Sequence, residues 1–252
     1  MSVSAPAIGF SFGNVFSDSF SVLGRNFGKF FLLAVLFTIP AQLYSQFVAQ
    51  PAMMGGGLNI HFFLSILIGL LMNGILTVAL VYGTIRDLQG QPADFAALLA
   101  RGLQLIGPTI LVILVASLAV VVGLVLLVVP GIIVAVILWV TLPAAVIEQP
   151  GVIASLNRSA TLTKGHRWEI FGILVVLVVA QIVLVLIIGL VIGGIFLSSG
   201  GGSGGVWILF IVSTLLQAVI TAVGSVLPAV GYYRLRIEKE GGDIRQIAAV
   251  FD

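Results

Sequence analysis

Residues 170–233 read IFGILVVLVVAQIVLVLIIGLVIGGIFLSSGGGSGGVWILFIVSTLLQAVITAVGSVLPAVGYY, and this run of 64 residues contains no charged side chain. A helix needs about 20 residues to cross a hydrocarbon core about 30 Å thick. The run is therefore long enough for two crossings. Its segment 198–205 consists only of glycine and serine, which suits a flexible turn between them. The stretch predicts a hairpin of two membrane-spanning helices.

Two further charge-free blocks lie upstream, Phe30–Ile85 with 56 residues and Gly102–Ile147 with 46 residues. Each is again long enough for two crossings. With 60% hydrophobic and only 8% charged residues, the composition is that of a polytopic membrane protein. We predict an all-α integral membrane protein with six transmembrane helices arranged as three hairpins. The expected spans are Phe30–Val48, Phe62–Tyr82, Gly107–Val129, Ile132–Ile147, Ile170–Leu197 and Val206–Tyr232.

All eleven lysine and arginine residues lie outside these blocks, so three hairpins place them on one face of the membrane. The turns expected on the other face, residues 49–61, Pro130–Gly131 and residues 198–205, contain neither lysine nor arginine. By the positive-inside rule, both termini are then cytoplasmic. The fourth span has only 16 residues, so the second hairpin is either tilted or partly interfacial.

One membrane domain accounts for residues 1–252, with a leader at 1–29, the bundle at 30–233 and a tail at 234–252. The leader has apolar residues at helical spacing, which is typical of an amphipathic helix lying in the interface. Similar stretches follow Gln91-Pro92, Gln149-Pro150 and Gly241-Gly242. These faces either pack against the cytoplasmic ends of the spans or contact the membrane or a partner. The apolar face of the leader consists of Phe12, Phe16, Phe20, Leu23 and Phe27.

A short pattern recurs before the first, third and fifth spans, in Leu23–Asn26, Leu99–Gly102 and Leu162–Gly165. It consists of leucine, any residue, a basic residue, and then asparagine or glycine, a combination typical of a helix end. A Leu-Pro-Ala triplet also recurs near the ends of the fourth and sixth spans, at Leu142–Ala144 and Leu227–Ala229. We infer a threefold repeat of an interfacial helix followed by a hairpin.

Uncharged polar side chains form stripes inside the predicted spans. Such side chains commonly bond between helices, with a contribution that averages about 0.6 kcal/mol. Alternatively, the stripes of spans one, two and six line a groove for a lipid headgroup or a small solute. The candidate groove residues are Gln42, Asn73, Ser213, Gln217 and Thr221.

The densest group of basic side chains lies at residues 158–169, before the fifth span, and a second basic edge follows the sixth span. Tryptophan and snorkelling basic residues anchor helices at the level of the headgroups. The same groups can bind the phosphate of an anionic lipid. The candidate headgroup contacts are Arg158, Lys164, His166, Arg167, Trp168 and Arg234.

No ionisable residue lies inside a predicted span, which argues against ion coupling through a buried acid. His61 and His166 fall on opposite faces, so this topology prevents them from sharing a metal or a catalytic site. The sequence has no catalytic triad, no metal-binding histidine pair and no phosphate-binding glycine loop. It also has no cysteine. We expect neither metal nor cofactor, no enzymatic activity, and no nucleic acid as a partner.

Three motifs point to a known family: Val128–Ile133, which reads VVPGII, Leu142–Ala144, and Ala154–Thr163, which reads ASLNRSATLT. Over residues 128–174 the sequence resembles the YciC-like bacterial inner-membrane proteins. It also resembles the membrane domain attached to some glycerophosphodiester phosphodiesterases. The resemblance implies a six-span protein of the bacterial inner membrane whose role is poorly defined. It does not imply phosphodiesterase activity, because that activity belongs to a separate soluble domain.

The sequence therefore favours a non-enzymatic membrane module that binds lipids, a partner protein or a second copy of itself. The alternative is a permease or lipid-translocating transporter in which the polar stripes form a path between repeats. A water-accessible groove that reaches the bilayer midplane would favour the transporter, whereas tightly closed spans would favour the module.

Overall fold

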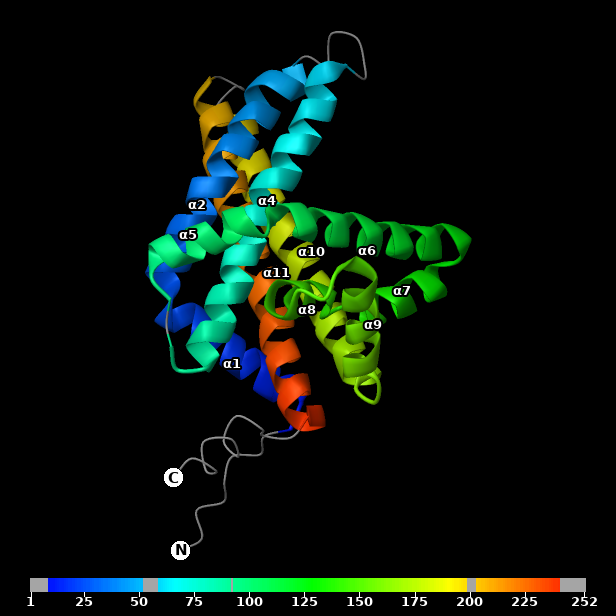
Figure 1. Cartoon of the computed structure of the whole chain (residues 1–252). Helices are drawn as coiled ribbons and strands as arrows, with labels where there is room; N and C mark the ends of the chain where they lie inside the picture. The colour runs from blue at the N-terminus through cyan, green and yellow to red at the C-terminus, as the bar shows by residue number, and fades with distance from the viewer. Residues whose placement is uncertain (1–8, 52–58, 92, 199–202, 241–252) are drawn as a thin grey trace, which may run out of the picture.

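The computed structural model describes residues 9–51, 59–91, 93–198 and 203–240, and helices are its only regular structure within these ranges (Figure 1). Six helical segments in the described ranges are long and apolar enough to cross a membrane, which confirms the all-α, multi-pass class. They are Phe27–Ala49, Ile60–Leu88, Ile106–Leu126, Val128–Glu148, Arg167–Val191 and Trp207–Glu240.

Four long helical segments run along the length of the molecule (Figure 1). The first is α2 (Phe27–Tyr44), continued by the π-helical turn η1 (Ser45–Ala49); the others are α4 (Ile60–Leu88), α10 (Arg167–Ser198) and α11 (Ser203–Glu240). At 1.5 Å per residue, the 29 residues of α4 span about 43 Å. Each of these segments is therefore long enough to cross a bilayer.

The second hairpin has a different direction. Its first limb, α6 (Ile106–Leu126), lies across the direction of α4 and extends sideways from the bundle, with α7 (Val128–Ile137) beside it (Figure 1). The predicted turn at Pro130-Gly131 is wrong, because the chain turns at Leu127, which has extended backbone angles. Pro130 instead lies in the first turn of α7, where its missing N–H costs no helical hydrogen bond.

Close backbone packing joins the two limbs of this hairpin. A Cβ atom on Gly123 would lie only 2.8 Å from the Cα of Gly131, so both positions require glycine for this approach. The returning limb is not continuous, because it breaks at residues 138–140 before α8 (Thr141–Glu148). With 10 residues in α7 and 8 in α8, neither piece is long enough to cross a bilayer alone.

Three short helices form where the amphipathic stretches predicted them: α1 (Phe12–Arg25), α5 (Phe95–Gln104) and α9 (Val152–Thr163). The stretch after Gly241-Gly242 lies outside the described residues. Helix α1 buries Val15, Ser19 and Val22, and it packs against α11. Its phenylalanines are instead partly or largely exposed, and their rings follow one another at centroid distances of 4.8 and 6.3 Å. The predicted apolar face therefore packs only in part: Phe16 and Leu23 contact the core, whereas Phe12, Phe20 and Phe27 are exposed.

Two of the three predicted helix ends are confirmed. Helix α1 stops at Arg25, and α9 stops at Thr163, just before Gly165 adopts a φ of 99°. The prediction at Gly102 is wrong, because α5 continues through it to Gln104. Gly102 serves a close helix contact instead: a Cβ there would lie 2.8 Å from the carbonyl oxygen of Ile75 in α4.

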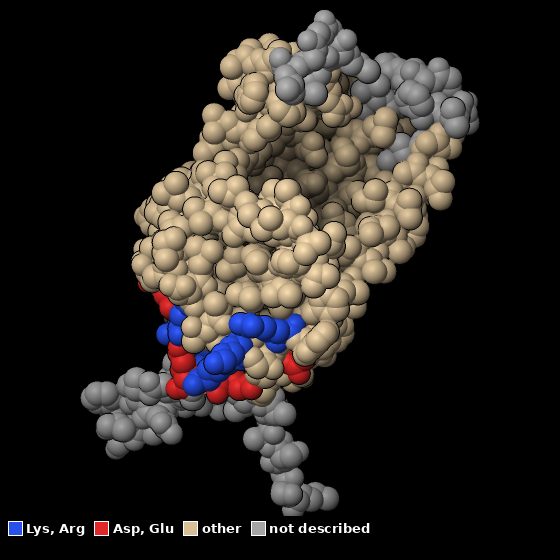
Figure 2. Space-filling model, turned by 90° about the vertical axis from the view of Figure 1, so that its right-hand side faces the viewer, with Lys and Arg blue, Asp and Glu red and all other residues tan. Residues whose placement is uncertain are grey.

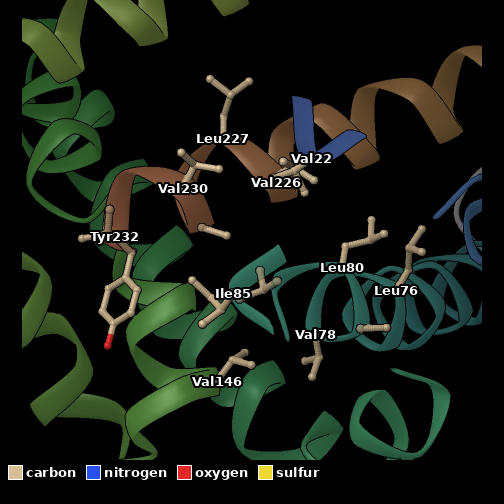
Figure 3. Packing of buried hydrophobic residues seen from close by; sticks show 14 of the residues in the cluster. Val22, Leu76, Val78, Leu80, Ile85, Val146, Val226, Leu227, Val230 and Tyr232 are labelled. Carbon is tan, nitrogen blue, oxygen red and sulfur yellow. The ribbon is translucent and has the colours of Figure 1, made fainter. Parts of the chain in front are cut away.

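The hydrophobic core lies in one half of the bundle. Its main contributors are the second half of α4, residues 74–85, and the segment 225–235 of α11 (Figure 3). Side chains of α1 and α8, including Val22 and Val146, complete it. In the other half, α10 and α11 present large apolar side chains at the surface, as expected for helices surrounded by lipid.

Candidate functional site at the charged end

Figure 2 shows that, on the face in view, acidic and basic side chains gather at one end of the molecule, while the rest of the surface is uncharged. We call this the charged end and define it by Glu148, Arg158, Asp18 and Arg234. It also holds His166, which pairs with Glu238 near the end of α11, whereas His61 lies in the first turn of α4 at the opposite end (Figure 1). The two histidines are therefore far apart, as predicted.

Arg158 is held by carboxylates from two other helices. Its Nε donates to both Glu148 oxygens at 2.9 Å, and its Nη2 also pairs with Glu240. Burial works to lower the pKa of the Arg158 guanidinium, but the hydrogen bonds and charges of Glu148 and Glu240 outweigh it and raise that pKa above its ordinary value. The buried Tyr232 hydroxyl also donates to Glu148 Oε1, at 2.6 Å. This cluster joins α8, α9 and α11.

Two more of the predicted headgroup residues have acidic partners. Arg234 donates from Nε to Asp18 Oδ2 at 2.7 Å and so connects α11 to α1. His166 lies between two glutamates, with its Nδ1 at 2.8 Å from Glu169 and its Nε2 at 2.9 Å from Glu238. Arg158, Arg234 and His166 are therefore each paired with a carboxylate of the protein itself.

The remaining three predicted residues, Lys164, Arg167 and Trp168, are exposed at the surface. Within the described residues, neither Lys164 nor Arg167 has a carboxylate partner. The Trp168 ring is 84% exposed and contacts Phe171 edge to face at 6.0 Å. Lys239 lies beside them, because its ammonium group donates to the backbone carbonyl of Lys164 at 2.5 Å. The structure thus brings three cations and one indole together here.

A second pair of cations was not predicted. The guanidinium carbons of Arg86 and Arg101 lie 5.9 and 5.7 Å from the centroid of the Tyr82 ring, within cation–π distance. Both Nε atoms are buried without a hydrogen-bond partner, and neither guanidinium pairs with a carboxylate in the described part of the chain. The four-residue spacing of Tyr82 and Arg86 was visible in the sequence, but Arg101 comes from the next helix.

By contrast, Arg25 pairs with a carboxylate of α4. Its Nε donates to Asp87 Oδ2 at 3.1 Å, and this hydrogen bond is the main reason that the pKa of Arg25 is raised. Asn26 donates to the other oxygen of the same carboxylate at 2.8 Å. Arg25 is therefore a useful reference for a cation that serves helix packing.

The predicted polar groove forms only in part. Gln217 Nε2 donates to Thr221 Oγ1 at 3.3 Å, and Thr221 Oγ1 donates to Asn73 Oδ1 at 3.4 Å, so three of its residues form a chain between α11 and α4. Ser213 donates to the carbonyl of Phe210 in its own helix. The side chain of Gln42 has no hydrogen bond to another described residue. The side chains of Ser213 and Gln42 are therefore not part of this series of hydrogen bonds.

The polar chain leads to a pocket of about 190 Å³ between α4, α6, α8 and α11. Thr77 and Ser225, each one helical turn beyond Asn73 and Thr221, line it, as do the prolines of both Leu-Pro-Ala triplets. Thr141 also lines the pocket, and its buried hydroxyl has no hydrogen-bond partner in the described ranges. Pro228 lacks an N–H, so the carbonyl of Gly224 loses its helical donor beside the same pocket.

Among the described residues, no group of three or more histidine, aspartate or glutamate side chains is placed to hold a metal ion. Comparison with family models, with characterised proteins and with solved structures finds no match for this chain. The resemblance to the YciC-like proteins therefore stays a prediction. The geometry of the charged end is the basis for the functional assignment below.

Proposed function

We propose that this chain is a non-enzymatic, multi-pass protein of the bacterial inner membrane that binds anionic phospholipids at its cytoplasmic face. Lys164 and Arg167 would contact the lipid phosphate, and Trp168 would lie among the headgroups. The observation that supports this assignment most directly is the selective pairing of charges. Arg158, Arg234 and His166 have carboxylate partners, whereas Lys164 and Arg167 are exposed and have none among the described residues.

The energetics of a charged surface support the same assignment. A lysine or arginine near an anionic membrane surface contributes about 1 kcal/mol, and a neighbouring carboxylate would cancel most of that attraction. The indole of Trp168 belongs to the amphipathic aromatic rings that prefer the membrane interface. Arg86 and Arg101 provide a second edge beside the Tyr82 ring, where Arg86 donates to the neutral Gln91 side chain and neither guanidinium pairs with a described carboxylate. We therefore expect two contacts for phosphate groups on the same side of the membrane.

Native mass spectrometry of the purified protein, reconstituted with phosphatidylglycerol and phosphatidylcholine, tests this function. We expect the Lys164→Gln/Arg167→Gln variant to bind phosphatidylglycerol roughly 30-fold more weakly, since two cations together contribute about 2 kcal/mol. The Arg25→Gln variant is the matched control, because its partner Asp87 already compensates that charge. Unchanged phosphatidylglycerol binding in the double variant would contradict the proposal.

A permease or lipid-translocating function is the second candidate, and the pocket beside Thr141 favours it. The polar chain of Asn73, Thr221 and Gln217 reaches this pocket from the uncharged half of the bundle. Since the chain has no native cysteine, a Ser225→Cys variant carries a single thiol. A transport path requires this thiol to react with a small water-soluble reagent in the folded protein. A thiol that reacts only after denaturation would argue for a closed bundle.

A further inference from the structure

The second hairpin projects from the bundle as an apolar arm. Helix α6 contacts the rest of the protein near its start, where Thr109 and Val112 are buried and Ile110 approaches Gly74 in α4. Its next buried residue, Gly123, packs closely against Gly131 and Pro130 of the returning limb. Figure 1 shows the far ends of α6 and α7 beyond the four lengthwise helices. The returning limb packs at its other end against α9 and α10, but the side chains of residues 124–129 at the tip are exposed in the described structure.

The arm also lacks the side chains that a turn in water requires. Residues 118–138 contain only apolar side chains and glycine. At the tip, Val125 is 81% exposed and Leu127 is 68% exposed. The predicted outer turns differ, because segment 49–61 includes Gln50, Asn59 and His61, and segment 198–205 is glycine and serine. A tip of this composition is stable in hydrocarbon and unfavourable among headgroups or in water.

The arm lies in the half of the molecule nearest the charged end. Helix α6 begins beside the middle of α4, where Ile106 and Ile110 approach Gly74, and the returning limb ends at Glu148 in the Arg158 cluster. A straight crossing by the 21 residues of α6 would carry Leu127 about 31 Å away, into the opposite headgroups. Instead, α6 lies crosswise to α4 (Figure 1). With α4 crossing the membrane, α6 therefore runs roughly parallel to the membrane plane.

We propose that α6 and α7 do not cross the membrane but lie within the leaflet nearest the charged end, with the acyl chains of that leaflet covering the arm. The chain then crosses the membrane four times, through α2 with η1, α4, α10 and α11. The arm adds apolar area to one leaflet only, so it favours membranes in which that leaflet is expanded. This inference does not depend on the headgroup site, because it rests on the direction and composition of the arm.

Site-directed spin labelling tests the position of the tip, since the chain has no native cysteine. Labels are placed at Val125→Cys and Leu127→Cys in proteoliposomes of phosphatidylcholine and phosphatidylglycerol. Collisions with oxygen report hydrocarbon, and collisions with a water-soluble nickel chelate report water. We expect both tip labels to collide with oxygen and to show no collision with chelate added to either side.

Two reference labels establish the sides of the membrane. Ile153→Cys lies on exposed α9 at the charged end, and Ser199→Cys lies in the segment between α10 and α11. Each reference label should collide with chelate added to only one side of the membrane, and the two labels should respond to opposite sides. If the tip labels collide with chelate on the side that reaches Ser199→Cys, the second hairpin crosses the membrane and the inference is wrong. Two tip positions are used so that one poorly folding variant does not decide the result.

Discussion

Replacing Glu148 by glutamine tests whether the ion cluster at the charged end holds the bundle together. Glu148 ends α8, and its carboxylate accepts from Arg158 in α9 and from Tyr232 in α11. Glutamine keeps the size of the side chain and one carbonyl acceptor, but it removes the negative charge. The Glu148→Gln variant therefore weakens the link between three helices without creating a large cavity.

The expected loss follows from the number of hydrogen bonds that depend on the charge. A hydrogen bond to a charged group contributes about 1.5–3 kcal/mol, against about 0.5–1.5 kcal/mol for a neutral one. Each of the two interactions at Glu148 then loses roughly 1 kcal/mol. Solvent screens this pair only partly, because its side chains are 24% and 22% exposed. We expect Glu148→Gln to lower the free energy of unfolding by about 2 kcal/mol, or roughly 30-fold in the unfolding equilibrium.

Reversible unfolding in mixed micelles, followed by circular dichroism, measures this change. Glu169→Gln is the matched control, since Glu169 is 43% exposed and His166 is its one ion-pair partner among the described residues. We expect that control to change stability by less than about 0.5 kcal/mol. The Glu148→Gln/Arg158→Gln double variant should lose less than the sum of the single variants, because the two side chains share one interaction. Equal effects of Glu148→Gln and Glu169→Gln would refute the reasoning.

Three further changes probe packing and charge. Gly231→Ala should destabilise the protein by about 1–3 kcal/mol in the same unfolding assay, because the new Cβ would lie 2.6 Å from Trp139 Cη2. A change below 0.5 kcal/mol would show that the indole moves freely. Asn73→Leu should cost only about 0.6 kcal/mol, because a single interhelical hydrogen bond is weak in membranes. Phosphatidylglycerol binding by the unchanged protein should weaken as salt rises from about 0.1 to 1 M, because exposed cations are screened; salt-independent binding would point to a buried site.

Much of the fold was predictable because lipid imposes a simple requirement on sequence. Charge-free blocks of 46 residues or more are stable only where hydrocarbon surrounds them, and they imply helices because backbone groups must pair internally. The short helices were predictable from the helical spacing of their apolar residues, and two of them also from the proline that precedes them. Their orientation was less predictable. In α1 the spacing predicted the helix, and Phe16 and Leu23 pack against the core, but the fully buried positions are Val15, Ser19 and Val22.

The candidate site was predictable as a region but not as a set of residues. Basic side chains before the fifth span were apparent in the sequence, and Trp168 beside them is typical of an interface. Which of these cations remain unpaired depends on acids that are distant in the chain. Asp18 reaches Arg234 across 216 residues, and Glu148 reaches Tyr232 across 84. Arg101 joins Arg86 at Tyr82 only because α5 packs against α4.

The sequence by itself determined the class of protein and the number of apolar helical segments. Hydrophobic length and the absence of charge are local properties, and they decide whether a segment is stable in the hydrocarbon core. Only the tertiary structure decided the direction of the second hairpin and the separation of paired from exposed cations. Hydrophobicity does not distinguish a helix that crosses the bilayer from one that lies within a leaflet. The direction of α6 is set by its contacts with α4 and α8, and such contacts are formed between segments that no local pattern connects.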